Sequence, residues 1–101
     1  MTNASKPLDF GFRDELLRDP EHAAFYLEQI LESGNMELFQ EALRNVAKAQ
    51  EGGVSAVAKR ANVNRENLYD ALSQSGKPQM ETITKTLSAL GLRFSITPAH
   101  R

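Results

Sequence analysis

The sequence of 101 residues contains no cysteine and only two histidines, His22 and His100. The lack of cysteine excludes disulfides and thiolate metal sites, and it suits a reducing cytoplasm. The histidines stand far apart without a second ligand at a metal-binding spacing, so we expect no metal and no other cofactor. No apolar run approaches the roughly 20 residues that span a bilayer, and no secretory signal begins the chain. We therefore expect one cytoplasmic domain.

The residue patterns of enzymes are also missing. No histidine lies within a helical turn of a serine and an acid, and neither a glycine-rich phosphate loop nor a paired-carboxylate spacing occurs. The pair Gly52 and Gly53, after Glu51, is instead typical of a helix terminator. A hydrophobic content of 41% in 101 residues is enough for a single helical core. The sequence therefore predicts a small binding protein and no enzyme.

Capping signals predict two helices in the first half of the chain. Asp19 followed by Pro20 is typical of a helix start, and this helix is expected to end at Gly34. Asn35 is expected to cap a second helix that runs to about Gln50. Apolar residues at helical spacing along both helices form the expected core: Ala23, Tyr26, Leu27, Ile30, Leu31, Phe39, Ala42, Leu43, Val46 and Ala47.

The stretch from Val54 to Leu72 predicts a helix-turn-helix. Two helices joined by a tight turn need a small residue where they cross and a turn residue that accepts a left-handed backbone. Ala58 meets the first need. Asn62 meets the second, because asparagine visits the left-handed region readily, although glycine is commoner there. Asn64 is then expected to be the N-cap of the second helix.

The outward side of this second helix begins with Arg65, Glu66, Tyr69 and Asp70, which are the candidate base readers. Arginine can address guanine with two hydrogen bonds, glutamate can accept one from cytosine, and tyrosine can contact a phosphate or a base edge. Lys77, in the following loop, is placed to reach a phosphate. The alternative interpretation is an ordinary corner between two helices with a solvated polar face.

Charge is divided unevenly between the halves of the chain, although the net charge is −1. Residues 1–51 hold five basic and ten acidic side chains, whereas residues 52–101 hold seven basic and three acidic ones. Such asymmetry is expected if one face meets phosphates and the other meets water or a basic partner. Chance segregation of solvated charges is the alternative. The glutamates expected on the outer sides of the first two helices, which suit a solvated face better than a docking surface, are Glu28, Glu32, Glu37 and Glu41.

The last part of the chain predicts a helix from about Met80 to Leu90, followed by a short β-strand. Leu92, Phe94 and Ile96 alternate with polar residues, as in a half-buried strand. A single strand cannot satisfy its own backbone. It is therefore expected to pair either with the N-terminal segment or with its copy in a second subunit.

The N-terminal segment carries Leu8, Phe10 and Phe12, which alternate with an acid and a glycine. This pattern predicts a strand or an apolar arm that lies over the helices. The expected organisation is an N-terminal arm, a helix-turn-helix domain and a loose tail, at residues 1–18, 19–96 and 97–101.

Four stretches of the sequence together resemble the addiction-module antidote family, a group of lambda-repressor-like helix-turn-helix proteins. They are Ala24–Glu28, Glu41–Gln50, Val57–Leu72 and Leu87–Ser95, and the resemblance covers about residues 8–96. Its most specific pieces are Leu-Tyr-Asp-Ala-Leu at the end of the helix-turn-helix and the later Leu-Gly-Leu-Arg.

The resemblance implies an antitoxin that neutralises a toxin encoded beside it and represses its own operon. The implied toxin belongs to the superfamily of ribosome-dependent ribonucleases or gyrase poisons. The residues that the resemblance places at DNA are Ser55, Asn64, Arg65, Glu66 and Tyr69, to which the charge pattern adds Lys59 and Lys77.

We therefore expect an all-α, lambda-repressor-like domain of about five helices with a short C-terminal strand. It is expected to bind operator DNA as a homodimer, whose two subunits contact each other through Leu92, Phe94 and Ile96. A basic toxin is expected to bind to the apolar arm and the acidic N-terminal half. The alternatives are a prophage-type transcriptional regulator without a toxin and a protein-interaction module that has lost DNA binding.

Overall fold

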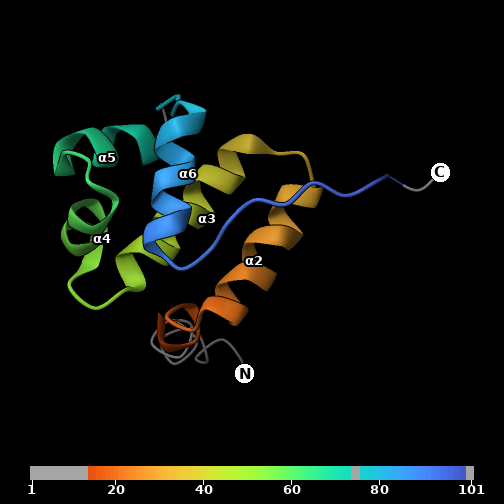
Figure 1. Cartoon of the computed structure of the whole chain (residues 1–101), viewed down its shortest axis with the longest axis horizontal. Coiled ribbons are helices and arrows are strands. Elements are labelled where there is room, and N and C mark those ends of the chain that lie inside the picture. Colours follow the sequence, from red (N-terminus) through yellow and green to blue (C-terminus); the bar gives the residue numbers. More distant parts are fainter. Residues whose placement is uncertain (1–13, 74–75, 100–101) are drawn as a thin grey trace, which may run out of the picture.

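Five α-helices make up most of the described chain, residues 14–73 and 76–99 of the computed structural model. A short helical stretch at residues 14–17 precedes them. In Figure 1, α4 and α5 lie on one side of the molecule and α2 lies on the other, with α6 between them. None of the described helices is long and apolar enough to cross a membrane. The five helices are α2 (Pro20–Glu32), α3 (Met36–Ala49), α4 (Gly53–Ala61), α5 (Arg65–Leu72) and α6 (Met80–Ala89).

The predicted caps of α2 and α3 are confirmed. The Asp19 carboxylate accepts a hydrogen bond from the Glu21 amide at 3.1 Å, and Pro20 opens the helix. The Asn35 side chain accepts one from the Leu38 amide at 3.0 Å. These side chains satisfy N–H groups that have no partner within the helix, and each such cap stabilises a helix by about 1 kcal/mol.

The core is built around α3, which contacts α2, α4 and α5, while α6 packs on α4. The predicted apolar stripe of α3 is buried throughout, with Phe39, Leu43 and Val46 at its centre. Leu31, which the helical spacing placed in the expected core, is instead exposed, and so is Met80 at the start of the last helix. Met80 is the first residue of α6, and 66% of its surface is accessible. The stripe of α6 therefore begins at Ile83.

The turn between α4 and α5 forms as predicted. Asn62 adopts a left-handed conformation, with φ 59° and ψ 44°. The amide of Val63 then donates back to the Ala58 carbonyl at 3.0 Å, which closes the end of α4. Asn64 caps α5, because its side-chain oxygen accepts from the amides of Glu66 at 2.8 Å and Asn67 at 3.2 Å.

The two glycines at the start of α4 do more than end the preceding helix. Gly52 is the N-cap of α4, with φ 85°, and Gly53 is its first residue. A Cβ atom on Gly52 would lie 2.7 Å from the Cβ of Ala56. The predicted terminator is thus also the start of the next helix, and the connection between α3 and α4 is tighter than expected.

The predicted C-terminal strand is wrong, since the described residues contain no strand. The chain after α6 runs extended across α2 (Figure 1). The Leu92 amide donates to the Leu87 carbonyl at 2.8 Å, and the Phe94 ring lies 6.4 Å from that of Phe39. This segment is held by side chains that pack against helices, because no neighbouring strand is present to form a ladder. The arm residues Leu8, Phe10 and Phe12 lie outside the described residues.

Residues 17 and 18, expected at the end of the N-terminal arm, pack into the helical domain. Leu17 is buried, and its carbonyl accepts a hydrogen bond from the Gln50 side chain at 3.0 Å. The Arg18 Nε donates to the Ala49 carbonyl at 2.7 Å. The start of α2 is therefore joined to the end of α3.

We predict that Asn62→Val destabilises the fold by about 1–2 kcal/mol, because a β-branched residue is strained in the left-handed region. Asn62→Gly is the matched control and should stay within about 0.5 kcal/mol of the wild type or above it, since glycine adopts this conformation at no steric cost. Urea unfolding followed by circular dichroism measures both variants. Equal stability of the valine variant and the wild type would contradict the assigned turn.

Candidate nucleic-acid interface

The start of α5 presents a polar face to solvent. Leu68 and Leu72 point into the core and are fully buried. On the other side of the helix, Arg65, Glu66 and Tyr69 are exposed, as the sequence predicts for a surface that meets a partner. The side-chain oxygen of Asn64 accepts from the amides of Glu66 and Asn67, so this oxygen is already engaged with the backbone of α5.

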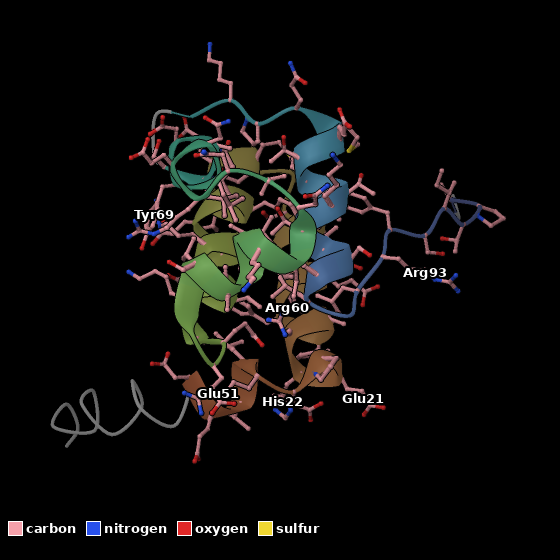
Figure 2. All side chains as sticks on the ribbon, turned by 60° about the vertical axis from the view of Figure 1, so that its left-hand side comes forward. Glu21, His22, Glu51, Arg60, Tyr69 and Arg93 are labelled. Atoms are coloured by element: carbon pink, nitrogen blue, oxygen red, sulfur yellow. The ribbon has the colours of Figure 1, made fainter. Side chains whose placement is uncertain are left out.

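Arg65 and Tyr69 form a pair on this face. The Arg65 guanidinium carbon lies 5.2 Å from the centre of the Tyr69 ring, one helical turn away. Tyr69 keeps 41% of its surface accessible, and Figure 2 shows it at the outer side of α5. The ring limits the conformations of the guanidinium, so less side-chain entropy is lost when the guanidinium binds an acceptor.

The outer side of α4 adds a second set of polar groups. Ser55 and Lys59, both predicted site residues, are exposed. Arg60 is exposed as well, and Figure 2 shows it projecting from α4. Arg60 is not among the site residues predicted from the sequence. The sequence could have indicated it, because Val57, Ala58 and Ala61 form the buried side of α4 and leave Lys59 and Arg60 facing solvent.

Lys77 is exposed but belongs to the far end of α5. The neighbouring Gly76 lies against the last turn of this helix, where an added Cβ would be 2.7 Å from the Ala71 carbonyl oxygen. Arg65, in contrast, opens the helix. An α-helix of this length spans roughly 12 Å. The structure therefore brings Arg65 and Tyr69 together and holds Lys77 apart from them.

Two side chains of α3 that were not among the predicted site residues also reach α5. The Gln40 side-chain amide donates to the carbonyls of Gly76 at 2.8 Å, Ala71 at 3.3 Å and Ser73 at 3.3 Å. An Arg44 terminal nitrogen donates to the Leu72 carbonyl at 2.9 Å. Gln40 lies beside Phe39 on the buried side of α3. A polar residue at such a core position is the feature of the sequence that could have indicated its role.

Helices α2 and α3 also carry exposed acidic and apolar groups. Glu28, Glu32, Glu37 and Glu41 are all exposed, as predicted for the outer sides of α2 and α3. Large apolar side chains are exposed beside them, with Phe25 accessible over 63% of its surface. The other exposed apolar residues of these two helices are Leu31, Met36 and Leu38.

The three residues predicted to join two subunits differ in their surroundings. Leu92 is half-buried against the core, and Phe94 packs on Phe39 within the same chain. Ile96 is 97% accessible. Of the three, Ile96 alone presents its whole side chain to solvent.

The described residues contain no candidate metal site, since no three histidine or acidic side chains among them lie close enough together to hold a metal ion. The candidate site is a surface of exposed basic, polar and aromatic groups on α4 and α5.

The sequence is similar to a family of known proteins. Residues 8–98 match the model of the family described as probable addiction module antidote proteins. An uncharacterized protein of Haemophilus influenzae is 38% identical over 96 residues, which cover 95% of this chain and 94% of that protein. No solved structure matches this chain. The chain therefore belongs to the family of probable addiction module antidote proteins.

Proposed function

We propose that this antidote binds operator DNA with α4 and α5, which act as a lambda-repressor-type helix-turn-helix, and that it represses its own operon. The observation that carries the proposal is the exposed start of α5, where Arg65 stacks on Tyr69 next to the N-cap Asn64. In such motifs the first residues of the second helix contact base edges in the major groove.

The charge distribution supports this orientation. The half of the sequence that contains α4 and α5 carries seven basic and three acidic residues. Lys59 and Lys77 are exposed there, so they are available to neutralise phosphates on either side of the base contacts. Arg60 is a further cation for the DNA backbone. The acidic α2 lies on the opposite side of the domain (Figure 1), away from the proposed DNA surface.

Arg65→Ala is expected to weaken binding to the DNA upstream of the gene by about 1–3 kcal/mol and to relax discrimination at one base pair. Lys77→Ala should instead weaken binding to all sequences alike, because a phosphate contact carries no sequence information. Fluorescence anisotropy with upstream and scrambled duplexes at one fixed salt concentration measures both effects.

Lys85→Ala is the control for a general loss of positive charge, since Lys85 pairs with Glu81 on α6 at 3.3 Å. If Arg65→Ala and the wild type bind the upstream duplex equally well, α5 does not read the operator. If the wild type shows no salt-dependent binding at all, the chain is a protein-interaction module that has lost DNA binding.

We further propose that the DNA-binding form is a homodimer. One helix-turn-helix reads few base pairs, whereas a two-fold dimer reads two half-sites about 34 Å apart. Ile96, at the end of the extended C-terminal segment, supplies an exposed apolar side chain for this contact.

Ile96→Asp should convert the dimer to a monomer, because it places a charge in the proposed interface. Ile96 does not belong to the hydrophobic core, so the substitution should leave the fold intact. Sedimentation velocity at micromolar concentration distinguishes the two states, and Thr97→Asp serves as the control for added charge at an exposed neighbour. A wild-type protein that sediments as a monomer would contradict the dimer.

The second partner that we propose is a basic toxin encoded next to the antidote gene. A toxin that acts on RNA must approach phosphates, so a basic surface is expected on it. The exposed acids of α2 and α3 complement such a surface and would speed encounter, while apolar side chains would hold the complex. The apolar anchors that we propose are Leu8, Phe10 and Phe12.

Replacing Leu8, Phe10 and Phe12 together by alanine should abolish capture of the neighbouring gene product while operator binding persists. Substitution is preferable to deleting residues 1–18, since Leu17 is part of the hydrophobic core. Co-expression and pull-down measure capture, with Arg65→Ala as the reciprocal control that should keep the toxin. Retained capture by the triple variant would move the interface elsewhere, and no capture by the wild type would favour a regulator without a toxin.

A further inference from the structure

The C-terminal end of α5 poses a hydrogen-bonding problem. The helix has eight residues, and the last four carbonyls of any α-helix have no partner within it. Half of the carbonyls of α5 therefore need hydrogen-bond donors from outside the helix. Helices this short are also marginal by themselves, so the position of α5 depends on what holds it from outside.

Donors for these carbonyls come from Ser73 and from α3. The Asp70 carbonyl accepts from the Ser73 amide at 3.2 Å and from the Ser73 hydroxyl at 2.7 Å, and the Ala71 carbonyl accepts from Gln40 of α3. Gln40 is nearly buried, and its side-chain amide lies within hydrogen-bonding distance of three carbonyls, those of Ala71, Ser73 and Gly76. One side chain thus joins the last turn of α5, the residue after it and the returning loop to the central helix.

Arg44, one helical turn further along α3, donates to the Leu72 carbonyl at 2.9 Å. A cation at the C-terminal end of a helix is also favoured by the helix dipole. Gly76 completes the arrangement, because a Cβ at this position would collide with the carbonyl oxygen of Asp70. The loop can therefore approach the helix end closely enough to share Gln40.

We propose that Gln40 and Arg44 are positioning residues for DNA binding: they fix the C-terminal end of α5 to α3 and so set the direction in which Arg65 and Tyr69 point. This inference rests on the proposed function of α5 as the recognition helix. Neither side chain needs to touch DNA for this role.

A clamp at one end of a helix controls its other end because the helix is short and stiff. Contacts of α5 are confined mainly to α3 and α4, so losing the attachment to α3 leaves the crossing with α4 as its main support. Bidentate contacts to bases demand closer alignment than contacts of a lysine with a phosphate. A shifted α5 should therefore lose specific binding before it loses non-specific binding.

The chain contains a matched control at the end of the same helix. Gln50, the C-cap residue of α3, also donates its side-chain amide to backbone carbonyls, those of Leu17 at 3.0 Å and Val46 at 2.9 Å. It ties the start of the described chain to α3 and makes no contact of this kind with α5. Gln50 thus shares the chemistry of Gln40 without its proposed role.

The test compares Gln40→Met with Gln50→Met, since methionine keeps the length of the side chain and removes its donors. Gln40→Met should lower the ratio of upstream to scrambled DNA affinity about tenfold, as expected when about 1.4 kcal/mol of contacts is lost. Gln50→Met should leave this ratio within about twofold. Thermal denaturation of both variants shows how much each loses in stability, and the binding assays are run well below both midpoints.

Hydrogen exchange of the DNA-free proteins gives a second readout. In Gln40→Met the amides of α5 should exchange faster than in Gln50→Met, because the helix end opens locally. Unchanged exchange in α5, or equal loss of the affinity ratio in both variants, would overturn the positioning role. Failure of the wild type to bind its upstream DNA would refute the proposed function and the positioning role together, whereas wild-type binding with an unaffected Gln40→Met overturns the positioning role alone.

Discussion

Burial of the apolar face of α3 is the constraint on which the rest of the structure depends. Phe39, Leu43 and Val46 are almost completely removed from solvent, and α2, α4 and α5 meet on the helix that carries them. Burying a large apolar side chain is worth about 1.5–3 kcal/mol, far more than a surface contact contributes. Helices as short as α4 and α5 would not persist in water, so they exist because α3 offers them a surface.

The same helix separates the two sides of the molecule. α2 and its exposed acids lie on one side, and the exposed start of α5 lies on the other (Figure 1). Between them, α3 contributes apolar contacts to both sides and polar anchors, Gln40 and Arg44, to the end of α5. A small antidote can in this way offer separate surfaces to DNA and to a protein partner, which is the arrangement that we propose.

Much of the helical plan could be predicted because its determinants are local. A side-chain oxygen that accepts from an amide two or three residues later needs no tertiary context, so Asp19, Asn35 and Asn64 marked three helix starts correctly. The same holds for Asn62, whose tolerance of the left-handed region is a property of the residue itself. Helical spacing likewise revealed the buried face of α3. The same spacing placed Arg65, Glu66 and Tyr69 on the outward side of α5, and the family resemblance pointed to the same residues; their role in DNA binding stays a prediction.

Only the tertiary structure decided which distant groups meet. Gln40 and Arg44 find acceptors 28 to 36 residues away, and a sequence shows at most that a polar residue stands at a core position. The alternation from Leu92 to Ile96 predicted a strand, but a strand needs a neighbouring strand. In the described chain Leu92 and Phe94 pack on helices instead, and Ile96 is exposed. The sequence by itself therefore determined where helices begin and which faces are apolar, since caps and spacing act within a few residues. The attachment of α5 and the course of the C-terminal segment depended on long-range packing and hydrogen bonds, which arise when the whole chain is folded.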